Sequence, residues 1–221
     1  MRARAAVVGL VLVTVGVFVW QQVSAEAPLP PSILYGAIPA RLTAAWEAWK
    51  AGDGLGMDIG SAAATLLTAV FLHGDPQHLI NNLLFLWVFA TLVARELGPV
   101  AMLGVFLVAG AAGNVFQASL SPLSLSPTIG ASGAVCGLEG AYLFLAIRRE
   151  LTWPYVWPMA RPVPPSQLAA MAVIGLVLDL FFLRGGSRGI AYGAHVGGFV
   201  AGAALGFAAT LWRPGAVGRR E

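Results

Sequence analysis

A serine and a histidine stand at the starts of two apolar stretches of this sequence. Ser132 lies within residues 130–133 (Gly-Ala-Ser-Gly), and His195 lies within residues 194–198 (Ala-His-Val-Gly-Gly). A serine hydroxyl is a weak nucleophile until a base accepts its proton, and a neutral histidine is suited to accept it near neutral pH. The pair therefore predicts a hydrolase in which Ser132 attacks and His195 acts first as base and then as acid.

A third apolar stretch supplies two further polar side chains. His78 opens this stretch, and Asn82 follows four residues later, which places both on one face of a helix. The oxyanion of a tetrahedral intermediate needs hydrogen-bond donors that are fixed in advance. We expect these donors to be a ring nitrogen of His78, the side-chain amide of Asn82 and the backbone amide of Ser132. Because no acidic residue lies near His195 in the sequence, a Ser–His dyad is predicted, and a carboxylate from a distant segment stays open.

Each of these residues also has a purely structural interpretation. Serine is a favoured helix N-cap, and a histidine at a membrane interface can satisfy a helix end. Asparagine within a span often bonds a neighbouring helix. For any one residue alone the structural interpretation is preferable. The occurrence of all four at matching ends of three apolar stretches favours a catalytic site.

The composition is that of an integral membrane protein. Of the 221 residues, 58% are hydrophobic and 10% are charged, and the mean hydropathy is +0.78. The basic residues are scattered over loops and ends, so no nucleic-acid partner is predicted. The sequence lacks His-Glu-x-x-His, and neither a metal ion nor a cofactor is predicted. Cys136, the only cysteine, forms no intramolecular disulfide.

The predicted fold is an all-α polytopic bundle of six transmembrane helices in a single membrane domain, residues 1–221. The predicted spans are approximately residues 5–20, 79–95, 99–120, 132–147, 167–183 and 195–212. Residues 1–25 are the first span, and a cleaved signal peptide is the open alternative. Residues 62–72 are too short to cross and are expected to rest at the interface or to re-enter. Residues 213–221 form a short cytoplasmic tail.

The basic residues also predict the orientation of the chain. With the amino terminus in the cytoplasm, nine of the thirteen Lys and Arg residues lie inside and four outside. The inner set comprises Arg2, Arg4, Arg95, Arg148, Arg149, Arg161, Arg213, Arg219 and Arg220, and the outer set comprises Arg41, Lys50, Arg184 and Arg188. The second, fourth and sixth spans then run inward, so His78, Ser132 and His195 all fall on the outer side.

Glycines at four-residue spacing predict which helices touch. Gly133 and Gly137 form a small-residue stripe on the fourth span, and Gly198 and Gly202 form another on the sixth. Such stripes permit close backbone approach, so we expect these two spans to meet there and to bring the serine and the histidine together.

Three other ionisable residues lie outside this proposed catalytic set. Glu139 and Asp179 lie inside predicted spans, where a charge is costly, so each is either protonated and hydrogen-bonded or faces a polar cavity. His73 is expected at the interface without a catalytic role.

Taken in order, these residues resemble the rhomboid family of intramembrane serine proteases. The resemblance covers a core at residues 66–212 and rests on His-Leu-Ile-Asn-Asn from His78 to Asn82, Arg-Glu-Leu-Gly at 95–98, Gly130 to Gly133, and Ala-His at 194–195 with Gly198, Gly202 and Gly206. It implies a Ser132–His195 dyad with an oxyanion site from His78, Asn82 and the Ser132 amide. It also implies a site that faces water within the membrane on the non-cytoplasmic side.

The resemblance implies an intramembrane serine endopeptidase, embedded in a lipid bilayer, whose partners are single-span membrane protein substrates. The expected location is the inner membrane of a bacterium, with the site facing outside. A non-catalytic rhomboid-like protein that binds transmembrane helices for quality control or trafficking is the alternative. One departure concerns Cys136, because the family pattern often has an aromatic residue there that packs on the catalytic histidine.

Overall fold

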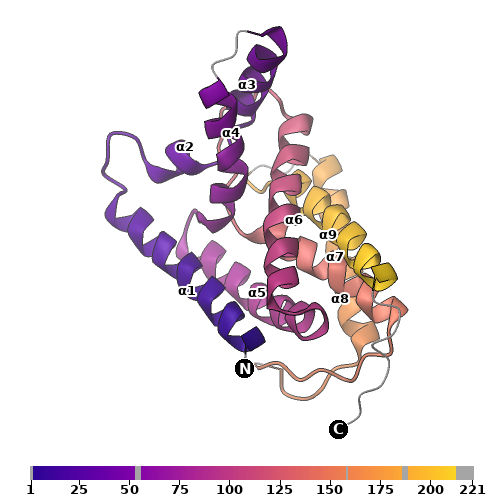
Figure 1. The fold of residues 1–221 in the computed structure, drawn as a ribbon. Helices are drawn as coiled ribbons and strands as arrows, with labels where there is room; N and C mark the ends of the chain where they lie inside the picture. The colour runs from indigo at the N-terminus through magenta and orange to yellow at the C-terminus, as the bar shows by residue number, and fades with distance from the viewer. Residues whose placement is uncertain (1, 53–55, 158, 186–188, 213–221) are drawn as a thin grey trace.

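The computed structural model describes residues 2–52, 56–157, 159–185 and 189–212, and this part of the chain is helical with no strand. The elements are α1 (Arg2–Val23), α2 (Pro31–Tyr35), α3 (Pro39–Ala51), α4 (Gly56–Thr68), the 3₁₀ turn η1 (Ala69–Phe71), α5 (Pro76–Leu97), α6 (Pro99–Leu120), α7 (Ser132–Arg148), α8 (Pro165–Gly185) and α9 (Tyr192–Trp212). Figure 1 shows their arrangement.

Local sequence explains where the site-bearing helices begin. Helices α5 and α6 both open with a proline, whose missing N–H costs nothing in the first turn of a helix. Asp75 caps α5, because its Oδ1 accepts a hydrogen bond from the backbone N–H of His78 at 2.8 Å. This cap fixes His78 in the first turn of α5. Gly98 has φ +90° and separates α5 from α6.

Five of the described helices, α1, α5, α6, α8 and α9, are long and apolar enough to cross a membrane. Helix α7 has 17 residues, so it is roughly 26 Å long and slightly shorter than a bilayer core of about 30 Å. The six predicted spans correspond to these six helices, and the predicted all-α polytopic fold is confirmed. Residues 62–72 fall on α4 and η1, where the apolar helical segment covers Ile59–Phe71.

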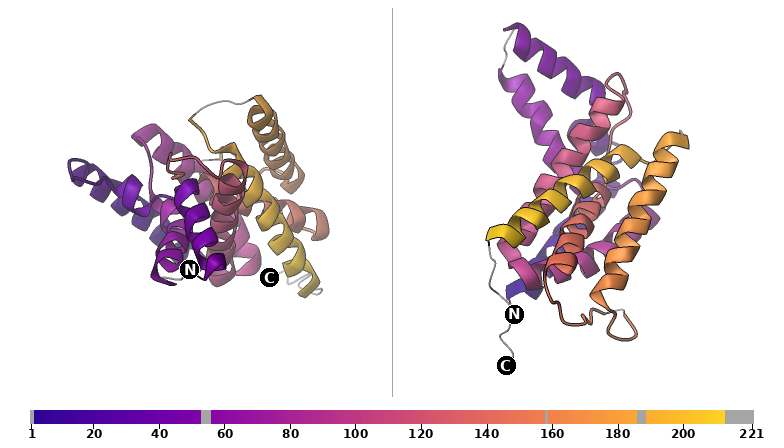
Figure 2. Two further views of the ribbon diagram at one scale, coloured as in Figure 1. Left: turned by 90° about the horizontal axis from the view of Figure 1, so that it is seen from above. Right: turned by 90° about the vertical axis from the view of Figure 1, so that its right-hand side faces the viewer.

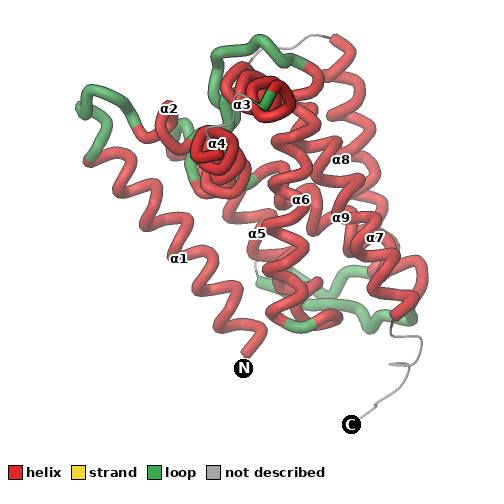
Figure 3. The backbone as a smooth tube through the Cα atoms, turned by 45° about the horizontal axis from the view of Figure 1, so that its top comes forward, coloured by secondary structure: helices red, strands yellow, loops and turns green. Residues whose placement is uncertain are grey.

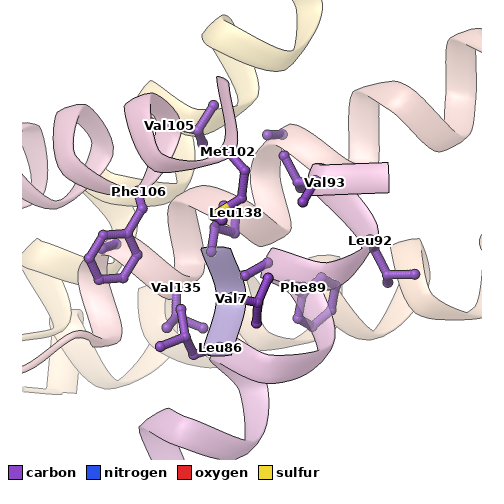
Figure 4. Packing of buried hydrophobic residues seen from close by; sticks show 14 of the residues in the cluster. Val7, Leu86, Phe89, Leu92, Val93, Met102, Val105, Phe106, Val135 and Leu138 are labelled. Carbon is purple, nitrogen blue, oxygen red and sulfur yellow. The ribbon is translucent and has the colours of Figure 1, made fainter. Parts of the chain in front are cut away.

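Side chains from α1, α5, α6 and α7 form the central cluster of buried hydrophobic residues (Figure 4). Its members include Val7, Leu86, Phe89, Leu92, Val93, Met102, Val105, Phe106, Val135 and Leu138. In α1 the buried positions Val7, Leu10, Thr14, Phe18 and Gln21 follow a helical stripe. Because lipid is as apolar as these side chains, close packing rather than escape from water holds this cluster together.

Of the basic residues that the structure describes, most lie at one end of the bundle. The amino terminus and the connection between α7 and α8 lie at this end, and α3 lies at the opposite end (Figure 1). Arg95 at the end of α5 donates to the Tyr155 carbonyl, and Arg149 after α7 lies 3.7 Å from the Glu96 carboxylate. Arg188, Arg213, Arg219, Arg220 and the predicted tail at 213–221 lie outside the described residues.

Helix α7 contacts α5, α6, α8 and α9, and α8 lies at one edge of the bundle (Figure 2). Figure 3 shows the loops that join these helices. A Cβ atom at Gly202 of α9 would collide with the carbonyl oxygen of Gly137 in α7, and one at Gly198 would collide with that of Gly133. The backbones of α7 and α9 are therefore in direct contact along the two glycine stripes.

Candidate active site

Ser132 and His195 are hydrogen-bonded to each other. Ser132 is the first residue of α7, and its Oγ lies 2.8 Å from Nε2 of His195 in the first turn of α9. Both side chains line a cleft of about 1050 Å³, which is also lined by His78, Asn82 and Asp179. The structure thus brings together the four polar side chains that the sequence singles out, although they come from three helices.

The other ring nitrogen of His195 contacts a residue that the sequence analysis did not assign to the site. Nδ1 lies 2.9 Å from Oδ1 of Asp179 in α8, and the two side chains are 15% and 17% exposed. Because no acid lies near His195 along the chain, the sequence alone predicts a dyad. In the structure, a carboxylate from a distant segment, Asp179, contacts the ring. The available signal was the presence of an ionisable residue within a predicted span.

The ring of His195 packs against Tyr192 in an edge-on arrangement, with centroids 5.9 Å apart. Cys136, where the family pattern often has an aromatic residue, is partly buried beside it. The Cys136 sulfur, an Asp179 oxygen and a His195 ring nitrogen all lie within 4.8 Å of one another. Zinc accepts such ligand types, but we assign the carboxylate and the imidazole to the hydrogen bond that already joins them.

His78 presents its Nε2 edge to the serine loop. Its Nδ1 accepts a hydrogen bond from the Gly74 N–H at 3.4 Å, so the ring proton is on Nε2. A Cβ atom at Gly130 would lie 2.8 Å from Nε2, and the same position would be 3.7 Å from the Ser132 hydroxyl. Gly130 has φ +122°. A glycine is required there both by this backbone conformation and by the close approach of the His78 ring.

Asn82 lies one turn further along α5 and is 6% exposed. Its Nδ2 donates to the carbonyl oxygen of His78 at 2.9 Å. An amide nitrogen carries two protons, so this bond leaves the second available to the cleft that Asn82 lines.

The loop before Ser132 is anchored by backbone atoms of earlier segments. Thr128 and Ala37 exchange two backbone hydrogen bonds of 2.9 and 3.1 Å. The Gly130 N–H then donates to the Ala69 carbonyl at 2.9 Å. Finally, the Ala131 N–H donates to Nε2 of His73 at 3.4 Å. These contacts fix the backbone that delivers Ser132 to the start of α7.

His73 is buried among protein atoms and is only 1% exposed. Its Nδ1 lies 3.2 Å from the Phe71 carbonyl, which can only accept, so Nδ1 carries the proton and Nε2 accepts from Ala131. Burial, and then the nearby His78, lower the pKa of His73 from 6.5 to about 4. The backbone of His73 is bonded through its N–H and C=O to the Gln21 side chain of α1.

The fold and the cleft define a polytopic membrane protein with a serine–histidine pair inside its helical bundle. Residues 61–212 match the family model described as Rhomboid domain. This match covers more than half of the chain, and the chain belongs to the rhomboid family. It is an integral membrane protein.

Similar curated proteins include both proteases and proteins named only as rhomboid-like. "Rhomboid protease GluP" of Bacillus subtilis is 31% identical over 155 residues, which are 70% of this chain and 28% of that protein. "Putative rhomboid protease YdcA" of the same organism is 34% identical over 117 residues, 53% of this chain and 58% of that protein. "RHOMBOID-like protein 12, mitochondrial" of Arabidopsis thaliana is 31% identical over 150 residues, 61% of this chain and 43% of that protein. The aligned part thus spans less than two thirds of each relative.

Proposed function

We propose that this protein is an intramembrane serine endopeptidase that cleaves transmembrane segments of other membrane proteins. The observation that carries the proposal is the 2.8 Å contact between Ser132 Oγ and His195 Nε2 at a cleft inside a bundle of membrane-spanning helices. A serine that serves only as an N-cap needs no histidine at its hydroxyl. The rhomboid proteases among its relatives support the same chemistry.

The proposed reaction begins when the Ser132 hydroxyl attacks the carbonyl carbon of a peptide bond. His195 Nε2 accepts the hydroxyl proton, and the oxyanion that forms is stabilised by the His78 Nε2–H, the Asn82 amide and the Ser132 backbone amide. When the C–N bond breaks, His195 returns the proton to the leaving amine, and an acyl-enzyme remains. A water molecule, deprotonated by His195, then attacks the ester carbonyl and releases Ser132.

The depth of the site sets the proposed substrate class. An intact transmembrane helix hides its carbonyl groups in its own hydrogen bonds, so a scissile segment must unwind. Ser132 opens α7, and Arg148 closes the same helix at the arginine-rich end. We therefore expect single-span membrane proteins as substrates, cut near the non-cytoplasmic interface. We place the protein in a bacterial inner membrane, with residues 66–212 as the protease core of a single membrane domain.

Activity-based labelling tests the proposal. Purified native protein in detergent should react with a fluorophosphonate and should cut a single-span substrate, whereas Ser132→Ala should do neither. His195→Ala should lose nearly all turnover, and the double variant should cost little more than either single one, because the two residues act as a unit. A folded native protein that neither labels nor cuts would contradict the proposal and favour a non-catalytic rhomboid-like protein that binds transmembrane helices.

A further inference from the structure

The geometry points to Asp179 as a positioning residue that holds the His195 ring in the orientation and tautomer that Ser132 needs. This inference rests on the proposed function, which it deepens from a dyad to a Ser132–His195–Asp179 triad. It is carried by two hydrogen bonds on opposite sides of one ring. Nε2 of His195 faces the serine hydroxyl at 2.8 Å, and Nδ1 faces the carboxylate at 2.9 Å.

The two bonds together determine where the imidazole proton lies. An ionised carboxylate only accepts hydrogen bonds, so the proton of neutral His195 is on Nδ1. Nε2 is then unprotonated and can accept the Ser132 proton. When that proton arrives, the imidazolium is stabilised by the adjacent negative charge. Asp179 contacts Nδ1 of His195, whereas the proton moves between Nε2 and the Ser132 hydroxyl, so its effect passes through His195.

The residue opposite Asp179 on α7 leaves space for this contact. Cys136 lies one turn after Ser132, and its short side chain shares the volume around the His195 ring with the carboxylate. The ring is also contacted by Tyr192 from its own helix. Two groups, Tyr192 on the ring and Asp179 on Nδ1, thus fill the supporting role that an aromatic residue at position 136 would have.

A structural role for Asp179 alone is the competing explanation. The buried residues of α8, which are Leu168, Ala169 and Ala172, all belong to its first half. Asp179 lies in the second half, where its bond to His195 also tethers the helix. The two roles differ in their pH signature, because a tether affects the amount of correctly folded enzyme, whereas a carboxylate at Nδ1 affects the protonation of the base.

Several groups besides Asp179 face His195 and must be considered in a pH experiment. Cys136 and Glu139 come from α7 and line the same cleft. His78 comes from α5 and is close enough to interact electrostatically with His195. Tyr192 belongs to α9 itself. Glu139 is the matched control, because it is a second carboxyl group of the cleft, and among the described residues the ring nitrogens of His195 bond Asp179 and Ser132 instead.

The experiment compares native protein, Asp179→Asn, Asp179→Glu and Glu139→Gln across about pH 5 to pH 9, around the usual range of histidine. Two rates are measured: cleavage of a single-span substrate, and fluorophosphonate labelling of Ser132. In labelling, the Oγ–P bond forms, the P–F bond breaks, the serine proton goes to His195 and fluoride leaves. Thermal stability in detergent is measured in parallel.

We expect Asp179→Asn to lower kcat by about 10³-fold or more, because an amide can donate to Nδ1 and hold the proton on the wrong nitrogen. KM should change little, and the acidic limb of both rate profiles should move to lower pH, because the imidazolium has lost its counter-charge. Asp179→Glu should restore part of the rate and return the limb towards its native position. Glu139→Gln should leave the limb in place.

Three results overturn the inference while the proposed function stands. One is an Asp179→Asn enzyme as active as the native protein. Another is a loss of rate that is equal at every pH and matches a loss of folded protein. The third is a limb that moves equally in Glu139→Gln. A native protein that neither labels nor cuts would instead contradict the proposed function itself.

Discussion

Helices α8 and α9 both pack on α7, but they are held there in different ways. The α9 backbone touches the α7 backbone, since Cβ atoms at Gly198 and Gly202 would collide with the carbonyl oxygens of Gly133 and Gly137. Helix α8 stands at the edge of the bundle, and its fully buried residues all lie in its first half. The contact between Ser132 and His195 is thus set by two backbones. The second half of α8, which carries Asp179, instead meets α9 through side chains, in the hydrogen bond to His195 and the stacked rings of Phe182 and Tyr192.

The two contacts therefore differ in how exactly the backbone fixes the position of the side chains. A nucleophile and its base must be held within a fraction of an ångström, and backbone contact along a rigid helix pair provides that. An orienting carboxylate can come from a less constrained helix, because a hydrogen bond to the histidine selects its position. The variants below test this division, from the largest expected effect to the smallest.

The largest effect is expected from Gly202→Leu in the tight interface. The added side chain would enter the space of the Gly137 carbonyl and force α9 away from α7. A displacement of about 1 Å can cost roughly 10²-fold in rate, and overpacking typically costs about 1–3 kcal/mol of stability. We therefore expect loss of cleavage, weak fluorophosphonate labelling and a lower melting temperature.

The control for this variant is Gly104→Leu in α6. A Cβ atom at Gly104 would have no neighbouring atom within 4 Å, so the same change in size should leave rate and melting temperature near native. Full labelling of Gly202→Leu with native melting would show that the α7–α9 contact does not align Ser132 with His195.

The second prediction concerns the α5 side of the site. His78→Ala should lower kcat by about 10²-fold, the usual cost of one oxyanion donor, with little change in KM. Asn82→Ala should have a similar or smaller effect, because one proton of its amide is already used by the His78 carbonyl. Steady-state kinetics with a single-span substrate measure both. A native kcat in both variants would show that α5 supplies no catalytic group. The Asn82 amide would then serve only in its hydrogen bond to the His78 carbonyl.

Much of this architecture follows from the sequence. The third predicted span, residues 99–120, coincides with α6, and the other spans lie within a few residues of their helices. Long apolar runs bounded by proline or glycine make such helices easy to recognise. The glycine spacing on residues 133–137 and 198–202 also predicts the correct helix pair, because close backbone approach leaves a four-residue signature.

Other features of the site depend on tertiary distances that the sequence does not contain. Asp179 and His195 are 16 residues apart and on different helices, and nothing local shows that their side chains meet. His73 and Ala131 are 58 residues apart, so the buried role of this histidine has no periodic signal either. Periodicity reports which face of a helix is buried, but it does not report which side chains of separate helices touch.

The third prediction uses His73 as a probe of the loop before Ser132. Its pKa falls from 6.5 to about 4 on folding, so below pH 6.5 the unfolded chain binds a proton that the folded protein excludes. The contribution of His73 to the free energy of unfolding is complete above pH 6.5, the pKa in the unfolded chain. It is lost as the pH falls towards about 4, the pKa in the folded protein. The loss amounts to about 3 kcal/mol. Melting of the native protein in detergent should therefore decline over this range.

The control is His73→Gln, which removes the titrating ring. Its melting temperature should be lower than native at neutral pH, because the Ala131 N–H loses its imidazole acceptor. Its decline between neutral pH and about pH 4 should be shallower than that of the native protein, and this difference isolates His73 from the acidic residues that titrate in the same range. Parallel curves would mean that His73 is not excluded from protonation in the folded protein.

The smallest effect is expected on the outer face of α8. Val177 lies two residues before Asp179, is 57% exposed and does not line the cleft. Val177→Ala should change stability by less than about 0.5 kcal/mol, because this side chain contacts lipid or detergent and gains little from packing on protein. The cleavage rate and the pH profile should also match the native protein. A clear fall in melting temperature would show that the second half of α8 is held by packing as firmly as α9, and the adjustable position of Asp179 would then have no structural basis.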